Sequence, residues 1–372
     1  MRSDEVFRRP WLKRADAKKA IAFQIGFAMA SMSMGLGHEA GASLMRSFIK
    51  SQFLTKTQRA PVDTDITGQV AIVTGGSSGL GYHAAHHLLS LKLSRLILAV
   101  RSMEKGNSAA TQLRAKYPNA EIDVWQLEMT SYESIQAFCH QVEKDLPRLD
   151  ITILNAGIVK GHFKKCSTGH EEALQVNYLS TFLLAILMLP LSKIKAPAGK
   201  PGRLTIVSSG TALWAKFPNR DKRPLLPSFD DTNITPWDGV ERYFSSKMLG
   251  HLFFVRLLPY LNPDEVIVNL VEPGMCKDSD LHREATGPAG VFLKVYKALT
   301  GRKPEDGAWT YVDAAVVKGR ESHGCFCMDW KIHPFTQLVY LSEGQPIMDA
   351  LWEETIAEFE FAGVREILKL TK

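Results

Sequence analysis

The sequence predicts an α/β fold, in which a doubly wound parallel sheet of about seven strands carries helices on both faces. Short apolar runs rich in β-branched residues alternate with longer segments of helical spacing from about residue 66 onward. A glycine-rich turn directly follows the first of these runs. Strands that are buried on both faces of a parallel sheet have such uninterrupted apolar runs, and their alternation with helices implies right-handed crossovers.

Six apolar runs of strand length form the expected sheet. They are VAIVT (70–74), RLILAV (95–100), IDVWQL (122–127), DITILN (150–155), RLTIVS (203–208) and VIVNLV (266–271). CFCMD (325–329) is the candidate for a last strand. The segments between the strands predict helices over 80–91, 103–116, 131–146, 169–194 and 242–261, and the tail from about 346 has the apolar spacing of a helix packed on the body.

Two regions interrupt this alternation. A proline- and aspartate-rich insertion occupies 210–241, and the segment 274–305 has no clear pattern. Irregular segments of this kind often carry binding residues. We expect residues 1–65 to form an N-terminal helical extension and linker, and residues 66–372 to form one domain with the insertion and a C-terminal helix.

Composition and charge are those of an ordinary globular protein, with 45% hydrophobic and 23% charged residues in 372 and a formal charge of +6. Basic and aromatic residues do not interleave, so we expect no nucleic-acid partner. The five cysteines are an odd number spread thinly, which argues against a disulfide framework. Cys325 and Cys327 are expected to be buried thiols, and no second Cys or His pair completes a metal site.

The apolar stretch AIAFQIGFAMASMSMGL (20–36) follows a basic segment, as a signal sequence or a membrane anchor does. It is short for a span of about 20 residues, and it contains Gln24 and two serines. Two interpretations stay open: a helix packed on the domain or lying on a membrane surface, which we favour, and a spanning anchor. We therefore expect a cytoplasmic protein in which any membrane contact is made through residues 20–36.

The glycine-rich turn reads TGGSSGLG and ends the first strand. Glycines allow a sharp turn and close approach of the backbone to a pyrophosphate, and the following helix offers free N–H groups to that anion. The turn lies between a buried strand and a helix, as a Rossmann-type dinucleotide site requires. The residues expected to bind the cofactor here are Thr74, Gly75, Ser77, Ser78, Gly79, Leu80 and Gly81.

The Gly-x-x-x-Gly-x-Gly spacing behind Thr74 resembles that of the short-chain dehydrogenase/reductase family. About twenty residues further on, AVRSMEKG has Arg101 where an NAD-dependent enzyme has a carboxylate for the ribose 2′-hydroxyl. Ser102 and Lys105 are close by in the sequence. A cation favours a 2′-phosphate, so we expect NADP(H) rather than NAD(H).

The resemblance implies further site residues. Asn155, Ala156 and Gly157 correspond to a family motif that stabilises the sheet and lines the cofactor. Asn177 corresponds to the catalytic asparagine, which bends its helix and helps a water to join the proton relay. Glu128 takes the place of an aspartate that faces the adenine.

The segment RYFSSKMLG (242–250) contains the Tyr-x-x-Ser-Lys pattern of the family. The resemblance implies that Tyr243 donates a proton and that Ser209 polarises a carbonyl, with Ser208 as its structural neighbour. Lys247, one helical turn from Tyr243, is expected to bind the nicotinamide ribose and to lower the phenol pKa from its ordinary value of about 10. Ser209 lies 34 positions before Tyr243, because the insertion fills the gap.

Pro273 and Gly274 are also expected at the cofactor. The family commonly has a threonine for the nicotinamide carboxamide where this chain has Asp278, with Ser279 next to it. Which of the two makes that contact stays open.

The sequence as a whole resembles the retinol-dehydrogenase-like branch of the family and the fungal reductases of secondary metabolism. The latter are similar over GRESHG and the LWEET helix. We expect an NADPH-dependent oxidoreductase that interconverts a ketone or aldehyde and an alcohol on an apolar small molecule. The alternatives are a non-catalytic cofactor-binding regulator and an isomerase or dehydratase of the same fold. Assembly into a homo-oligomer stays open.

Overall fold

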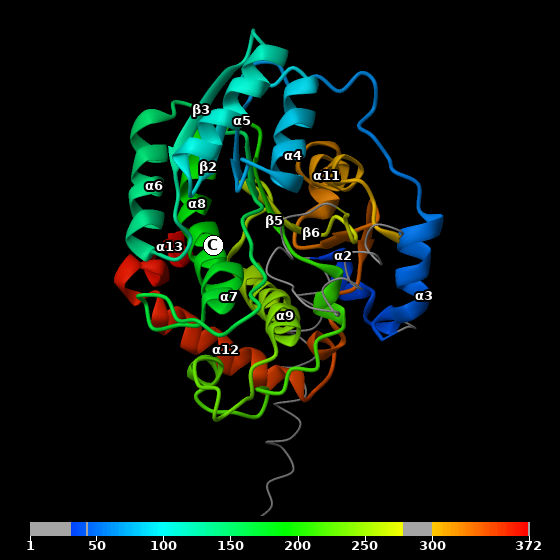
Figure 1. The fold of residues 1–372 in the computed structure, drawn as a ribbon, viewed down its shortest axis with the longest axis vertical. Coiled ribbons are helices and arrows are strands. Elements are labelled where there is room, and N and C mark those ends of the chain that lie inside the picture. The colour runs from blue at the N-terminus through cyan, green and yellow to red at the C-terminus, as the bar shows by residue number, and fades with distance from the viewer. Residues whose placement is uncertain (1–30, 42–43, 278–299, 371–372) are drawn as a thin grey trace, which may run out of the picture.

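The computed structural model describes residues 31–41, 44–277 and 300–370. Its centre is an eight-stranded sheet with the order β3-β2-β1-β4-β5-β6-β7-β8 (Figure 1). The first seven strands run parallel, and β8 is antiparallel to β7. The strands are β1 (Val70–Thr74), β2 (Arg95–Val100), β3 (Glu121–Gln126), β4 (Ile151–Leu154), β5 (Gly202–Val207), β6 (Val266–Val271), β7 (Phe326–Met328) and β8 (Lys331–His333).

The predicted parallel sheet is confirmed, with each predicted strand within a residue or two of its expected bounds. The short strand β8 was not predicted. It follows a two-residue turn at Asp329 and Trp330, whose φ angles are 51° and 61°. Such turns usually contain glycine or asparagine, so a tryptophan in this position gave no hairpin signal.

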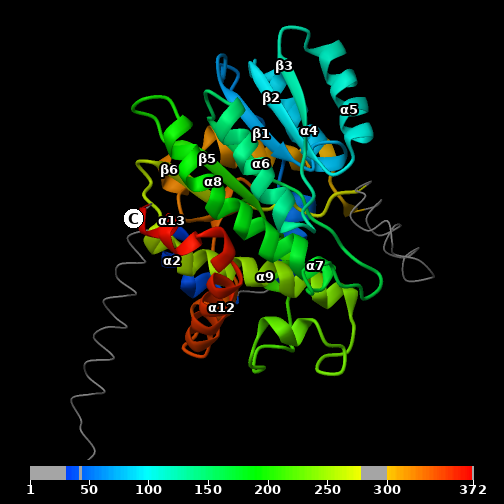
Figure 2. The same cartoon turned by 90° about the vertical axis from the view of Figure 1, so that its left-hand side faces the viewer.

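Helices cover both faces of the sheet (Figures 1 and 2). One face carries α6 (Tyr132–Asp145), α8 (Thr181–Lys195), α9 (Gly239–Leu257), α12 (Gly344–Glu358) and α13 (Val364–Leu370). The other face carries α4 (Gly79–Ser90), α5 (Met103–Lys116) and α11 (Pro304–Val312). Helix α11 was not predicted, although Pro304 and two acidic residues in its first turn are typical of a helix start.

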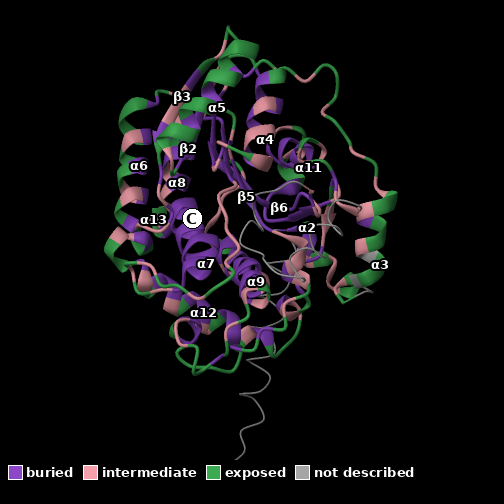
Figure 3. Ribbon diagram, viewed as in Figure 1, coloured by how far each residue is buried: buried purple, intermediate pink, exposed green. Residues whose placement is uncertain are grey.

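Strand β1 shows why the strands are apolar throughout. Val70 and Ile72 belong to the core on one face, whereas Ala71 and Val73 belong to the core on the other. Figure 3 shows the buried strands behind helices such as α5 and α6, which carry exposed residues on their outer sides. Two-sided burial therefore accounts for the runs that predicted the fold.

A long apolar helical stretch passes through the core. It consists of α7 (Glu172–Leu174), a π-helical segment (Gln175–Ser180) and α8. Among the described residues it is the one helix with the length and hydropathy of a membrane span, and 89% of its most apolar window is buried in the protein. Packing against the sheet explains its composition.

The described part of the N-terminal extension packs on the β7–β8 end of the sheet. It contains α2 (Met32–Gly35), α3 (Leu44–Ile49) and a π-helical turn (Lys50–Leu54). The Ser33 hydroxyl donates to His333 O at 2.7 Å and accepts from Phe326 N at 2.9 Å. Residues 31–36 of the apolar stretch thus lie on the body, as in the favoured interpretation, while residues 20–30 lie outside the described residues.

The insertion lies beside α12, on the side of α9 that faces away from the sheet (Figure 2). It contains 3-10 turns at Gly210–Leu213 and Leu226–Phe229. The Glu354 carboxylate on α12 accepts from Leu225 N at 2.7 Å and from Leu226 N at 2.8 Å. These contacts fix the insertion to the C-terminal helix.

Candidate active site

The candidate site residues gather at the carboxyl edge of the sheet. Strands β1 and β4 are neighbours, and the strand order runs outward from them in both directions. Ligands bind at such a switch point in doubly wound sheets. The glycine turn follows β1, and Asn155, Ser209 and Glu272 follow β4, β5 and β6 respectively.

The glycine turn has the shape of a phosphate cradle. Gly75 has a φ of +65°, and a β-carbon on Gly81 would lie 2.5 Å from both the Asn155 side chain and Gly75 O. Helix α4 begins at Gly79, and its N-cap residue Ser78 makes no side-chain capping bond. The N–H groups of the first helical turn are therefore open to an anion, and the cradle fits a dinucleotide pyrophosphate.

Hydrogen bonds join this turn to the end of β4. The Thr74 hydroxyl accepts from Asn155 N at 2.9 Å and from Ala156 N at 3.0 Å, and the Asn155 amide donates to Thr74 O at 2.9 Å. Leu80, in the first turn of α4, packs against the hydrophobic core on that face of the sheet. A β-carbon on Gly157 would lie 3.2 Å from Asn177 Oδ1 and 3.7 Å from Lys247 Nζ. The strand-end motif thus connects the cradle with the candidate catalytic groups.

Two cationic side chains, Arg101 and Lys105, follow β2 in the sequence, on the side of the sheet edge next to the glycine cradle. Arg101 is 59% exposed, and its Nε is 3.9 Å from Glu128 Oε2. Lys105 lines an open pocket of about 370 Å³ together with Ser77 and Ser78. The pocket lies where the sequence predicts an adenosine phosphate, and Glu128 partly balances the charge of Arg101.

Asn177 lies in the π-helical segment between α7 and α8. Its amide donates to Ile158 O at 2.8 Å and to Ser246 Oγ at 3.1 Å, and its Oδ1 accepts from Ile158 N at 2.8 Å. π-helical turns widen a helix and often occur at functional sites. The predicted irregularity at Asn177 therefore takes the form of a π turn fastened to the loop after β4.

Tyr243 and Lys247 lie on consecutive turns of α9 and are 7% and 6% exposed. Lys247 Nζ donates to Val207 O at 2.9 Å, at the end of β5. Burial lowers the pKa of Lys247 to about 8. Among the described residues this is the one hydrogen bond that the amine makes, so its other N–H groups can serve the hydroxyls of a bound ribose.

The phenol of Tyr243 remains a weak acid in this arrangement. Burial raises its pKa to about 12, with the Glu272 carboxylate acting in the same direction and a hydrogen bond from Ser209 acting against both. The expected lowering of this pKa by Lys247 is therefore wrong for this structure. The cost of burying a phenolate outweighs the effect of any nearby cation.

The two serines after β5 point to different partners. Ser209 interacts with Tyr243, and its Oγ accepts from Thr211 Oγ1 at 2.9 Å. Ser208 Oγ lies 3.0 Å from His251 Nε2. Ser208 thus makes a structural contact, as predicted, and Ser209 is the serine that faces the phenol.

The turn after β6 closes this side of the site. Gly274 has a φ of +76°, and Pro273 O accepts from Arg302 Nη1 at 3.3 Å. Asp278 and Ser279 lie outside the described residues. The carboxylate of Glu272, a site residue that was not predicted, lies between this turn and the turn after β5. Within the described ranges, no cluster of His, Cys, Asp or Glu could hold a metal ion.

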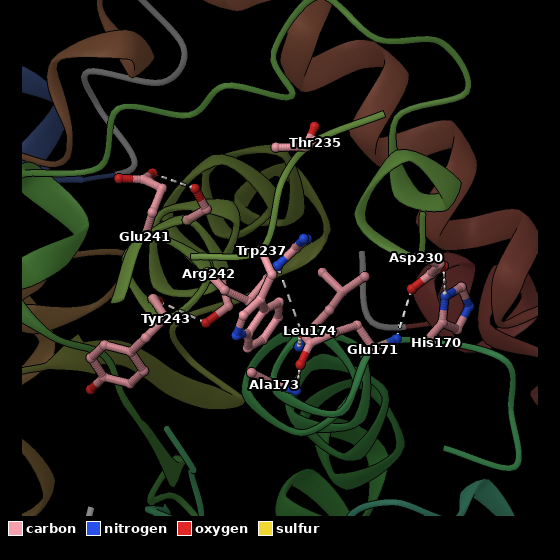
Figure 4. Close-up of polar contacts among 12 residues, drawn as sticks. His170, Glu171, Ala173, Leu174, Asp230, Thr235, Trp237, Glu241, Arg242 and Tyr243 are labelled. Atoms are coloured by element: carbon pink, nitrogen blue, oxygen red, sulfur yellow. Dashed lines mark hydrogen bonds and ion pairs between the residues drawn. The ribbon is translucent and has the colours of Figure 1, made fainter. Parts of the chain in front are cut away.

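A buried charged network next to Tyr243 was also not predicted (Figure 4). His170 Nδ1 lies 2.8 Å from Asp230 Oδ2 in the insertion, and His170 Nε2 lies 3.2 Å from Glu358 Oε1 on α12. Burial acts against protonation, but the bonds to these two carboxylates outweigh it and raise the pKa of His170 to about 9. His170 is therefore an imidazolium at neutral pH, and it joins three segments of the chain.

The same network reaches the residue before Tyr243. Asp230 Oδ1 accepts from Glu171 N at 2.7 Å, and Glu171 Oε2 lies 3.8 Å from Arg242 Nε. The Arg242 guanidinium lies 4.6 Å from the Phe229 ring centroid. Arg242 and Glu171 are 4% and 0% exposed, so the insertion is anchored by buried charges at the start of α9.

Comparison with known proteins agrees with this geometry. The family model described as short chain dehydrogenase matches residues 69–218. The chain is 55% identical over 326 residues to the short chain dehydrogenase/reductase mfmJ of Annulohypoxylon moriforme, covering 87% of this chain and 94% of the relative. It is 40% identical over 349 residues to the short-chain dehydrogenase fogG of Aspergillus ruber, covering 92% of this chain and 100% of the relative.

A solved structure shares the fold. The Pseudomonas aeruginosa RhlG/NADP active-site complex has a TM-score of 0.53 at 23% identity, covering 75% of this chain and 98% of that chain. The family assignment rests on the glycine cradle after β1, on the Tyr-x-x-Ser-Lys pattern in α9 and on fungal relatives that match over nearly their full length. The protein belongs to the short-chain dehydrogenase/reductase family of oxidoreductases.

Proposed function

We propose that the protein is an NADPH-dependent reductase of a ketone or aldehyde on an apolar small molecule, able to run in reverse as an alcohol dehydrogenase. The observation that carries this proposal is the convergence of three side chains at the carboxyl edge of the sheet: Ser209 after β5, Tyr243 on α9, and Lys247 one turn further along α9 and bonded to the end of β5. The fungal relatives favour a role in secondary metabolism.

The cofactor supplies hydride chemistry at the carbonyl carbon. Ser209 donates a hydrogen bond to the carbonyl oxygen and polarises it, and Tyr243 gives its proton to the alkoxide oxygen. Lys247 binds ribose hydroxyls with the N–H groups that do not face Val207 O. Asn177 fastens the loop after β4 to Ser246, in the turn of α9 between the tyrosine and the lysine.

The protonated state of Tyr243 at neutral pH suits the reductive direction. At about 12, the phenol is protonated at neutral pH and is ready to donate. An alcohol dehydrogenase needs the phenolate as its base, which this environment disfavours. We therefore infer that reduction is the faster direction near neutral pH and that oxidation requires alkaline conditions.

NADP(H) preference is proposed on the basis of two cations that follow β2: the exposed Arg101, and Lys105, which lines the open pocket together with Ser77 and Ser78. The test is a fluorescence titration with NADPH and NADH. Arg101→Ala is expected to weaken NADPH binding about tenfold and to leave NADH binding within about twofold. Lys144→Ala, an exposed cation on α6, is the matched control and should change neither. Equal affinity of the wild type for both nucleotides would contradict the preference.

An apolar substrate is proposed because aromatic residues of the insertion lie near α9. Trp237 packs edge-to-face on Phe163 with ring centroids 5.7 Å apart, and the guanidinium of Arg242 lies 5.6 Å from the Trp237 ring centroid. Trp214 and Val240 of the same region are 38% and 58% exposed. These side chains offer apolar surface around the start of α9.

A carbonyl screen followed by NADPH absorbance tests the reaction. Tyr243→Phe is expected to reduce kcat by at least about a hundredfold while NADPH binding stays within about threefold. NADPH binding without turnover would favour the regulator, and product without net NADPH consumption would favour the isomerase or dehydratase. For location we propose the cytoplasm, with any membrane contact made through residues 20–36, of which residues 31–36 pack on the body.

A further inference from the structure

Glu272 is a buried carboxylate that joins the two turns beside the candidate catalytic groups. It directly follows β6 and is 5% exposed. Its Oε2 accepts from Gly274 N at 2.8 Å and from Gly210 N at 3.4 Å. Gly210 follows Ser209, so one carboxylate oxygen connects the turn that bears the serine with the Pro273–Gly274 turn.

Four ionisable groups on the surrounding elements interact electrostatically with Glu272. They are Tyr243 on α9, Tyr311 on α11, Arg302 before α11 and Asp329 after β7. Arg302 is already engaged: its Nη2 pairs with Asp329 and donates to Ser51 O at 2.6 Å. The one cation among the four therefore forms its ion pair with Asp329 rather than with Glu272.

This environment places the ionisation of Glu272 in the physiological range. Burial and the negative charge of Asp329 raise its pKa to about 7, against the opposing effects of Arg302 and the two backbone N–H groups. When ionised, Glu272 raises the pKa of Tyr243. The carboxylate therefore changes its charge near neutral pH, and this charge acts on the phenol of Tyr243.

We propose that Glu272 is a positioning residue of the reaction: it fixes the turn that carries Ser209, and its charge controls how tightly Tyr243 holds its proton. This inference rests on the proposed reductase function. With Glu272 neutral, Tyr243 is a stronger acid and protonates the alkoxide more readily. With Glu272 ionised, the proton is held more tightly, and reduction is slower.

The variant Glu272→Gln separates the hydrogen bonds of Glu272 to the two turns from the effect of its charge. Glutamine has almost the same shape, and its amide oxygen can accept the same two backbone hydrogen bonds, but it carries no charge. A merely structural role would thus be preserved, whereas the pH dependence would change. Glu265→Gln, at the opposite end of β6 and ion-paired with Lys193 at 2.7 Å, is the matched control.

The experiment measures the pH profile of kcat/KM for carbonyl reduction and for alcohol oxidation in the wild type and both variants. In the wild type, reduction should fall several-fold as the pH rises through about 7. In Glu272→Gln this step should disappear, and the oxidation profile should move about half a pH unit to one unit toward lower pH. Glu265→Gln should follow the wild type.

Asp329→Asn provides a second test that keeps Glu272. Loss of the Asp329 charge lowers the pKa of Glu272, so the step in the reduction profile should move to lower pH. This variant decides the matter if Glu272→Gln fails to fold. A wild-type profile in Glu272→Gln, or an unmoved step in Asp329→Asn, would overturn this inference alone. Absence of turnover by the wild type would overturn the proposed function and the inference with it.

Discussion

Replacing His170 with glutamine removes the imidazolium that joins the α7 region, the insertion and α12. His170 contacts Asp230 and Glu358 at 2.8 and 3.2 Å, and its side chain is 12% exposed. Glutamine retains hydrogen-bonding capacity but cannot take up a proton. The variant therefore isolates the contribution of the charge to stability.

The magnitude follows from the pKa values in the two states. The pKa of His170 is about 9 in the folded protein, against 6.5 for an ordinary histidine. Each pKa unit corresponds to about 1.4 kcal/mol, so protonation contributes about 3 kcal/mol to the free energy of unfolding. Because the folded pKa is raised, this contribution is complete below pH 6.5 and is lost as the pH rises through about 9.

The assay is urea unfolding of the wild type and His170→Gln at several pH values between about 6 and 10. The difference in unfolding free energy should be largest at the acidic end and should shrink by about 3 kcal/mol toward the alkaline end. His140→Gln is the matched control, because the His140 side chain is 82% exposed on α6. A difference between the wild type and His170→Gln that stays constant over this range would refute the reasoning.

Two further substitutions test the packing of the site. Gly81→Ala should cost about 1–3 kcal/mol of stability and abolish nucleotide binding, because the new methyl group would lie 2.5 Å from a main-chain oxygen. The control is Gly35→Ala, where the methyl group would meet no atom within 4 Å. This control should change neither the thermal unfolding nor the nucleotide titration. Arg242→Met should lower the free energy of unfolding by about 3–5 kcal/mol, because it leaves the buried Glu171 carboxylate without its cation. The control Arg365→Met, on the surface, should lower it by less than about 1 kcal/mol in urea unfolding. Equal effects within either pair would contradict these assignments.

Local sequence signals were sufficient for the sheet and much of the site. The inner parallel strands are buried on both faces, so their apolar runs were visible without any knowledge of their neighbours. Residues that directly follow a strand, such as Asn155 and Ser209, reach the same edge because parallel strands place their carboxyl ends together. The position of a residue directly after a strand was therefore enough to place it in the site.

The features that were missed depend on contacts between distant segments. His170 and Asp230 are 60 positions apart, and no local pattern links a loop histidine to an aspartate in an insertion. Glu272 next to a Pro-Gly pair has the sequence appearance of a surface carboxylate, and only the fold shows that it is buried. The pKa of Tyr243 was predicted in the wrong direction for the same reason, since the depth of burial is not encoded in the spacing to Lys247.

The docking of α2 on the end of the sheet has a consequence for association between molecules. Exposed edge strands are templates for pairing with other chains, and proteins protect them with charges, short strands or covering segments. The β3 edge carries Glu121 and Asp123, which pair with Arg95 on β2, whereas β8 has three residues and is bonded to Ser33 of the extension. A shortened chain that begins at residue 55 would uncover the β8 edge, and we expect it to aggregate through edge-to-edge strand pairing rather than to remain monodisperse.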